Sequence, residues 1–456
     1  MLKKIIFFFF IILISCTNNE KYNDSEYTVL ENITIIDGKG NQPLENMFIV
    51  LKDSLIVDIA SMENKNYGQK VNKLNLNGNY VIPGLIDMHA HVTVLPLTKD
   101  GYLAHNIDTS VSIVSLQTLL NFGITTVRNP AGPEDDAVWL REQVKLGHII
   151  GPRIYTSGRA LNRNSSSPFV KVNTDEEIQN AIAKQISVGV DFIKVYGGLK
   201  PEQTQKAIEY AHSKNLKVIG HLQNTSWTDA AKDNIDFITH AFSWAPEYLP
   251  EKFRHKYSPT ILGRLYWLDN IDLEMGTIPE MIKLVKEKNI SIDPTLIALH
   301  TKFWGNDSIY LYSPYNSFVD STILDIWKKY TFVDDWKSKD FDKAKKLWPK
   351  VLKYIKLIYD NGILLTTGSD FPNPWVVPGI SLYQEMKLLN DCGITPLEVI
   401  KIATYNGAQA LGLDKKLGSI EKNKIADLVV LSKNPIDNIL NINSVRMVFK
   451  NGNKIN

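Results

Sequence analysis

The chain has 456 residues, of which 44% are hydrophobic and 22% are charged, and its formal net charge is +2. This composition is typical of folded globular proteins and argues against a disordered chain. The nearly neutral charge, without a cluster of Lys and Arg among aromatic residues, argues against nucleic acid as a partner.

The first 26 residues are expected to direct export and to tether the protein to a membrane. Two lysines precede the apolar stretch 5–14, which is too short to span a bilayer as a stable helix and is typical of a secretory signal peptide. Residues 13–16 resemble the lipobox of bacterial lipoproteins, in which Cys16 would carry the lipid. We therefore expect residues 1–15 to be a signal peptide and residues 16–26 a tether. The protein would then be lipid-anchored in a bacterial cell envelope, on its periplasmic or outer-membrane face.

Both ends of the remaining chain carry short β-type runs. Residues 27–80 contain several such runs separated by turns, a pattern typical of a small antiparallel sheet. Residues 412–456 return to β-type runs at 426–431 and 444–450. Two or three strands would be unstable alone. We therefore expect the two ends to form one small β-sandwich.

Residues 81–411 alternate apolar β-type segments with helical ones, which predicts a (β/α)₈ TIM barrel. The eight predicted strands are 81–87, 124–128, 153–157, 192–196, 217–221, 237–240, 290–294 and 362–370. Gaps of about 50 and about 70 residues follow the sixth and seventh strands, longer than a normal barrel repeat, and are interpreted as insertions. Their many aromatic residues either cover a pocket or form the cores of the insertions.

Residues able to bind a metal end several of these strands. His89 and His91 follow the first strand, and residues two apart on a strand point to the same side. Four further residues lie at or near the ends of later strands: Lys194, His221, His240 and Asp370. The carboxyl ends of the strands are the face at which barrel enzymes carry out catalysis.

The alternation of side chains along a strand supports this grouping. It places Lys194 inside the barrel, and it turns His221 and His240 inward if Ile219 and Ile238 fill the barrel. Four imidazoles and a carboxylate are a typical zinc ligand set. An ammonium would repel the metals, so the lysine fits only if its neutral amine reacts with carbon dioxide to form a carbamate. Taken singly, each residue has an ordinary structural explanation, but their equivalent places on different strands favour a metal site.

The chain resembles the amidohydrolase superfamily over nearly its whole length after residue 27. The matching segments are 83–91, 123–128, 192–196, 239–241, 367–370 and 418–428. The resemblance implies the barrel and the β-sandwich. It also implies two metals, zinc by preference: His89, His91 and Asp370 hold one, His221 and His240 hold the other, and carbamylated Lys194 bridges them.

Residues 194–196 resemble the branch of imidazolonepropionase-related and Xaa-Pro dipeptidase-like hydrolases. Gln223, Thr239 and Asn129 depart from residues common in that branch. These departures leave the metal ligands unchanged and concern the identity of the substrate.

The predicted function is metal-dependent hydrolysis of an amide or other carbon–nitrogen bond in a small molecule, such as an Xaa-Pro dipeptide or an N-acyl amino acid. Asp370 would act first as general base and then as general acid. Tyr196, Arg128 and His300 are candidate contacts to a substrate carbonyl or carboxylate, although each has an alternative structural role. Two alternatives stay open: a single-metal deaminase or cyclic-amide hydrolase with an ordinary Lys194, and a solute-binding lipoprotein without activity. A homo-oligomer is compatible with every alternative.

Overall fold

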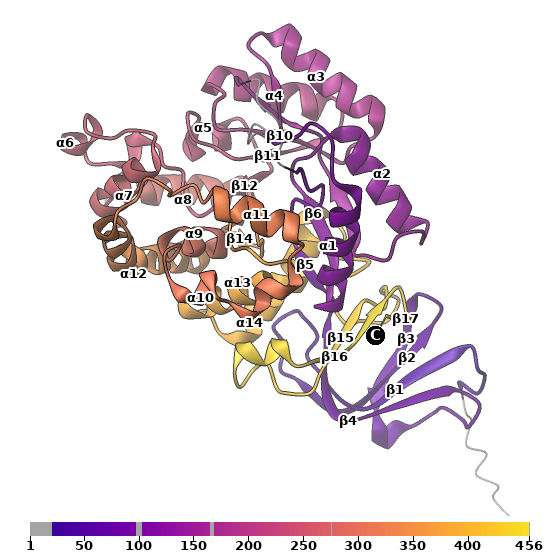
Figure 1. Cartoon of the computed structure of the whole chain (residues 1–456). Coiled ribbons are helices and arrows are strands. Elements are labelled where there is room, and N and C mark those ends of the chain that lie inside the picture. The colour runs from indigo at the N-terminus through magenta and orange to yellow at the C-terminus, as the bar shows by residue number, and fades with distance from the viewer. Residues whose placement is uncertain (1–20, 97–102, 165–167, 275, 456) are drawn as a thin grey trace, which may run out of the picture.

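The computed structural model describes residues 21–96, 103–164, 168–274 and 276–455 (Figure 1). The expected signal peptide, residues 16–20 of the expected tether and, with them, the expected lipidation site Cys16 lie outside these ranges. Within them, no helix combines the length and the apolar character needed to cross a membrane.

Eight parallel strands form the predicted TIM barrel. They are β5 (Leu85–Asp87), β6 (Ile124–Asn129), β7 (Arg153–Thr156), β10 (Phe192–Val195), β11 (Lys217–Gly220), β12 (Phe237–Thr239), β13 (Ser291–Asp293) and β14 (Leu364–Leu365). A parallel bridge between Ser157 and Phe192 joins β7 to β10. On the other side, Met88 N donates to Thr367 O at 2.8 Å, which closes the ring between β14 and β5. The fold prediction is therefore confirmed.

Helices surround the barrel, and the two long gaps hold the predicted insertions (Figure 1). The helices before β12 are α1 (Thr109–Asn121), α2 (Glu134–Lys145), α3 (Asp175–Val188), α4 (Pro201–Ser213) and α5 (Trp227–Lys232). Between β12 and β13 lie α6 (Glu251–Arg254), α7 (Ile261–Asn270) and α8 (Thr277–Glu287). Between β13 and β14 lie α9 (Leu296–Phe303), α10 (Ser308–Leu311), α11 (Ser321–Lys329) and α12 (Ser338–Asp360). After β14 come α13 (Ile380–Asp391), α14 (Pro396–Lys401), a π-turn at Ile402–Asn406 and α15 (Gly407–Leu411).

Several aromatic residues of the insertions form a packed core. The ring of Phe242 lies 4.6 Å from that of Tyr354 and 5.5 Å from that of Trp267, measured between centroids. These side chains are buried. These three residues therefore form the core of the insertions and do not cover a pocket.

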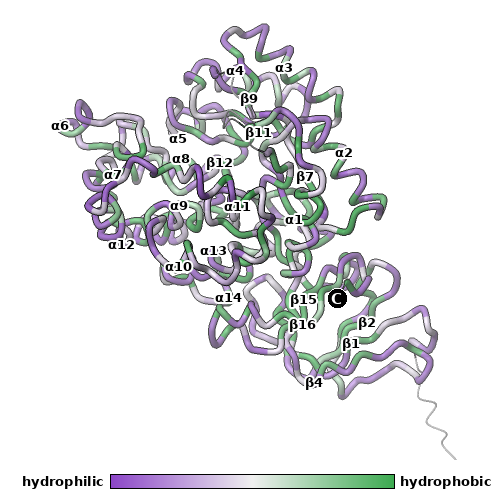
Figure 2. The backbone as a smooth tube through the Cα atoms, in the orientation of Figure 1, coloured by the Kyte–Doolittle hydropathy of each residue, from purple (hydrophilic) through white to green (hydrophobic). Residues whose placement is uncertain are grey.

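The two ends of the chain share one domain beside the barrel, as predicted. Its seven strands are hydrogen-bonded in the order β17-β16-β15-β4-β1-β2-β3. Hydrophobic and hydrophilic stretches of tube alternate through this domain in Figure 2. The strands are β1 (Tyr27–Ile35), β2 (Leu44–Lys52), β3 (Leu55–Ser61), β4 (Asn72–Pro83), β15 (Leu428–Leu431), β16 (Val445–Lys450) and β17 (Asn453–Lys454). The N-terminal part is not purely antiparallel, because β1 pairs with β4 in parallel. The expectation of an antiparallel sheet was wrong on this point.

The apolar run 81–87 is divided between the two domains, which corrects its prediction as a single barrel strand. Its first three residues end β4 and pair with β15, and only Leu85–Asp87 belongs to the barrel. The division falls at Gly84, whose N–H donates to Asp427 O at 2.8 Å. A Cβ at Gly84 would lie 2.2 Å from Thr125 Oγ1, so a side chain would prevent this close packing. Both halves are buried, and for that reason hydropathy does not reveal the break.

Candidate functional site

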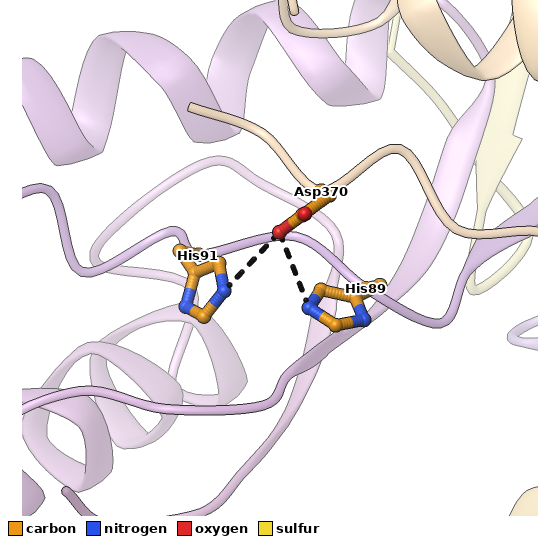
Figure 3. A group of neighbouring side chains, drawn as sticks. All are labelled: His89, His91 and Asp370. Atoms are coloured by element: carbon orange, nitrogen blue, oxygen red, sulfur yellow. Dashed lines mark ion pairs between the residues drawn. The ribbon is translucent and has the colours of Figure 1, made fainter. Parts of the chain in front are cut away.

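Three predicted ligands meet where β5 and β14 end. His89 Nε2 lies 3.2 Å from Asp370 Oδ1, and His91 Nε2 lies 3.5 Å from the same oxygen (Figure 3). One possible ligand atom from each of the three residues lies within 4.8 Å of the others. A parallel bridge between Ala90 and Phe371 holds the two chain segments together. These residues form the first ligand group.

The other three predicted ligands form a second group beside the first. His240 Nε2 and His221 Nδ1 are 2.7 Å apart. Lys194 Nζ lies 3.3 Å from Thr239 Oγ1, next to His240 in the chain. The rings of His240 and His89 are 5.1 Å apart between centroids, which places the two groups side by side. The structure thus brings all six predicted ligands together at the carboxyl ends of the strands.

The alternation of side chains along β12 does not predict how the His240 side chain is directed toward the site. Phe237 packs inside the barrel with Phe192 and Ile219, whereas Ile238 packs in the outer core. The expectation that Ile238 fills the barrel was therefore wrong. His240 has φ +74°, which lies in the left-handed region and turns its side chain back toward the site. Such a conformation costs about 1–3 kcal/mol and is typical of functional residues.

Asp293, at the end of β13, supports the first ligand group and was not predicted. Its Oδ2 lies 2.7 Å from His89 Nδ1, and its Oδ1 accepts a hydrogen bond from Arg128 Nη2 at 2.5 Å. A carboxylate behind a metal-binding imidazole fixes the tautomer and the orientation of the ring. One sequence signal could have revealed it, because Asp293 ends a predicted strand in the same way as the other ligands end theirs.

Two of the three predicted substrate contacts have structural positions instead. Arg128 is fully buried, and its Nε donates to Met88 O at 2.7 Å, so this side chain holds Asp293 in place. His300 stacks on Trp304 at 4.0 Å, and its Nδ1 lies 2.6 Å from the hydroxyl of Tyr310. We therefore correct both predictions: Arg128 supports the site through Asp293, and His300 packs among aromatic rings.

Tyr196, the third predicted contact, lies at the boundary between the site and an open cavity. Its ring stacks on His221 at 4.2 Å. The cavity has a volume of about 500 Å³, and its lining includes Tyr196, Gln223 and Pro259. Burial raises the pKa of Tyr196 to about 12, so the hydroxyl stays protonated at neutral pH and is able to donate. This position suits a contact to substrate.

The donor atoms suit divalent metal ions. Burial lowers the pKa of His221 and of His240 well below the ordinary value, so both imidazoles are neutral, as a metal ligand requires. Burial alone would raise the pKa of Asp370, but the charge of His89 and the hydrogen bonds from His89 and His91 hold it well below its usual range. The neutral imidazoles of His221 and His240 and the ionised carboxylate of Asp370 are donors that zinc accepts.

Replacing Asp293 with Asn is expected to weaken zinc binding about 10–100-fold, because His89 loses the carboxylate that orients it. A competition titration with a coloured chelator measures this change. The matched control is Asp236→Asn, since Asp236 Oδ2 also contacts a histidine, His212 Nε2 at 2.8 Å, but at the surface. An unchanged zinc affinity in Asp293→Asn would contradict the supporting role.

Comparisons with known proteins agree with this geometry. The sequence profile of the Amidohydrolase family matches residues 80–455. The imidazolonepropionase of Pseudomonas savastanoi pv. phaseolicola is 22% identical, over 85% of this chain and 87% of that protein. The ochratoxinase of Aspergillus niger is 23% identical, over 91% of this chain and 83% of that protein. A solved Xaa-Pro dipeptidase with bound methionine in its active site has a TM-score of 0.68 at 21% identity and covers 94% of this chain and 99% of its own. The family profile spans most of the chain, and this protein therefore belongs to the amidohydrolase family of hydrolases that act on carbon–nitrogen bonds.

Proposed function

We propose that this protein uses two divalent metals, zinc by preference, to hydrolyse the amide bond of a dipeptide or an N-acyl amino acid. The observation that carries the proposal is the convergence of six donor residues in two adjoining groups. His89, His91 and Asp370 would hold one metal, and His221 and His240 the other. A solute-binding protein without activity would not need a buried general base beside such a ligand set.

Lys194 is suited to link the two groups. It lies on β10, is buried, and is close enough to Asp370 to feel its charge. Burial lowers the pKa of Lys194 to about 7, so much of the amine is neutral near neutral pH. A neutral amine adds to carbon dioxide and releases one proton, which gives a carbamate with a negative charge and two oxygen donors. This change converts a repelling ammonium into a ligand.

The side chains of the site divide the chemistry among them. A bound divalent metal polarises the scissile carbonyl and makes water more acidic. The ionised carboxylate of Asp370 accepts a proton from the attacking water and then delivers it to the leaving nitrogen. The hydroxyl of Tyr196, at the edge of the cavity, donates to a substrate oxygen. His91 is partly exposed, so the first ligand group is open to the substrate.

The similar proteins support the choice of bond but differ in their substrates. A Xaa-Pro dipeptidase acts on dipeptides, and the imidazolonepropionase represents the alternative of a cyclic amide. A single-metal deaminase or cyclic-amide hydrolase would leave Lys194 as an ordinary buried amine. The number of metals needed for activity therefore separates the two proposals.

Removal of metal is expected to abolish hydrolysis, and about two equivalents of zinc per chain to restore it, because each ligand group accommodates one ion. The experiment treats the protein with a chelator, dialyses it, and titrates zinc in the presence of bicarbonate. A panel of Xaa-Pro dipeptides, N-acyl amino acids and imidazolones reports the activity. Full recovery at one equivalent would contradict the binuclear site. Cleavage of imidazolones alone would favour the cyclic-amide alternative.

We also propose a location for the protein. This proposal places the protein in a bacterial cell envelope, anchored by a lipid on Cys16, and it depends on residues 1–16 of the sequence. Residues 21 and 22 of the expected tether 16–26 already belong to the small β-domain, because Lys21 Nζ lies 3.2 Å from Asp58 Oδ2 and Tyr22 is buried, so the tether is shorter than predicted. A short tether would therefore hold this domain close to the membrane surface.

A further inference from the structure

Two cationic side chains near the site lack an anionic partner. Arg264 lies on α7 and Lys302 on α9, and both are partly buried. No carboxylate of the described residues forms an ion pair with either. Arg264 Nε is buried without a hydrogen-bond partner in the part of the chain that the structure describes, and the same holds for the hydroxyl of Tyr257. Unpaired buried polar groups of this kind are costly, so their retention calls for a function.

The helices that carry these cations are attached to the site. Pro259, just before α7, lines the cavity together with Tyr196 and accepts a hydrogen bond from Gln223 Nε2 at 3.2 Å. The N-cap residue of α9 is Thr295, whose Oγ1 lies 2.8 Å from His240 Nδ1. A residue at or just before the start of each helix therefore touches the site or its cavity (α7 and α9 in Figure 1).

The charges of the two cations and of the ligand groups affect one another's pKa, in keeping with the attachment of α7 and α9 to the site. After burial, the charge of Arg264 is among the causes that lower the pKa of His221, and it also acts on Lys302 and Tyr196. Asp370 acts on Lys302 as well. The nearest aromatic rings do not neutralise these charges: Lys302 Nζ lies 4.9 Å from the ring of Phe332, and the Arg264 guanidinium lies 5.6 Å from that of Trp244.

A carboxylate is the complement that this arrangement lacks. Guanidinium groups bind carboxylates with two parallel hydrogen bonds, and such bonds are shorter and stronger than neutral ones. A lysine ammonium and a tyrosine hydroxyl supply further hydrogen-bond donors, and neither carries a negative charge that would repel a carboxylate. Dipeptides and N-acyl amino acids both carry a free carboxylate one carbon from the scissile amide nitrogen.

We propose that Arg264 and Lys302, together with the hydroxyl of Tyr257, bind the free carboxylate of the substrate. The enzyme then releases a C-terminal amino acid and rejects substrates whose carboxylate is amidated. This inference rests on the proposed function, because it takes the substrate to be an acyl amino acid or a dipeptide. Arg264 and Lys302 are substrate-binding residues in this proposal and take no part in proton transfer.

Calorimetric titration of the zinc-loaded full chain tests the proposal with probes that it cannot hydrolyse. The probes are N-methanesulfonyl derivatives of L-proline, L-phenylalanine and L-methionine, each beside its C-terminal amide. The acids are expected to bind at least about 100-fold more tightly than the amides. Arg264→Gln is expected to remove this preference, Lys302→Gln to reduce it, and Arg264→Lys to restore part of it.

The controls distinguish binding of the substrate carboxylate from metal binding and from hydrolysis. Arg446→Gln, at an exposed arginine of β16, is expected to keep the preference, and every variant is expected to keep its metal content. Equal binding of acids and amides, or an unchanged preference in Arg264→Gln, would overturn the proposal. Hydrolysis of N-acyl amino acids and of dipeptides is measured separately, and it also shows which of these two classes is the substrate. Binding of acids without hydrolysis refutes the proposed function alone, whereas equal hydrolysis of acids and amides refutes the carboxylate site alone.

Discussion

Replacing Asp370 with Asn is expected to lower kcat about 10²–10⁴-fold, the range typical of a lost general acid–base group. Its carboxylate lies 3.2 Å from His89 Nε2, and its pKa is held well below the usual range, so it is ionised at neutral pH and is able to accept a proton. An amide of the same size accepts no proton. Its oxygen still reaches the first ligand group, and the metal is therefore expected to remain bound.

The measurement compares kcat on the best substrate of the panel with the metal content of the same preparation. Asp391→Asn serves as the matched control, because this exposed aspartate at the end of α13 only pairs with Lys387, at 2.6 Å. It is expected to leave kcat unchanged. Retention of nearly full activity by Asp370→Asn, with the metal in place, would exclude the proton-transfer role. Loss of the metal would show instead that Asp370 acts chiefly as a ligand.

The metal ligands could be predicted because each carries a local signal. A strand that is buried on both faces is a run of apolar residues, and a polar residue at its end stands out in the sequence. His221 and Asp370 were found in this way, and the structure places them beside the other ligands. The carboxyl ends of parallel barrel strands meet at one face, so the pattern alone brings distant residues together.

For residues that act through tertiary contacts, a position at the end of a strand did not reveal the role. The role of Asp293 depends on His89 and Arg128, which are far from it in the sequence. Arg128 follows an apolar strand just as a catalytic residue would, and only its complete burial shows that it supports the site. The left-handed backbone of His240 and the domain break at Gly84 likewise arise from packing that periodicity does not encode.

The insertions were the least predictable part of the chain. Their helices vary in length and follow no barrel repeat, so sequence alone could not show which side chains face the site. His300, a predicted substrate contact, packs among aromatic rings, whereas the charges of Arg264 and Lys302, which no sequence pattern marks, are felt at the site. If the proposed carboxylate site is correct, substrate recognition depends on the segments in which sequence patterns are weakest.

Replacing Lys194 with Ala is expected to remove one of the two metals and to lower kcat at least about 10³-fold, since metal ions at such sites supply several kcal/mol of transition-state stabilisation. The substitution removes a buried side chain whose place is surrounded by Thr239, His221 and His240. If a carbamate normally occupies this place, a small carboxylate such as propionate can enter it and supply the two missing oxygen donors. Propionate with zinc is therefore expected to restore part of the activity and the second metal.

Lys194→Met is the matched control for this rescue. Methionine is similar in length to lysine and fills the space with apolar atoms, so no carboxylate can enter, and no rescue is expected. Both variants are expected to fold, because Lys194 forms no ion pair among the described residues and its removal leaves no buried charge unpaired. The cavity in Lys194→Ala lowers stability more than the filled site in Lys194→Met. Metal content and kcat, each with and without propionate, are measured for both variants. Two metals in Lys194→Ala without propionate would contradict a bridging carbamate, and equal rescue of both variants would show that propionate acts elsewhere.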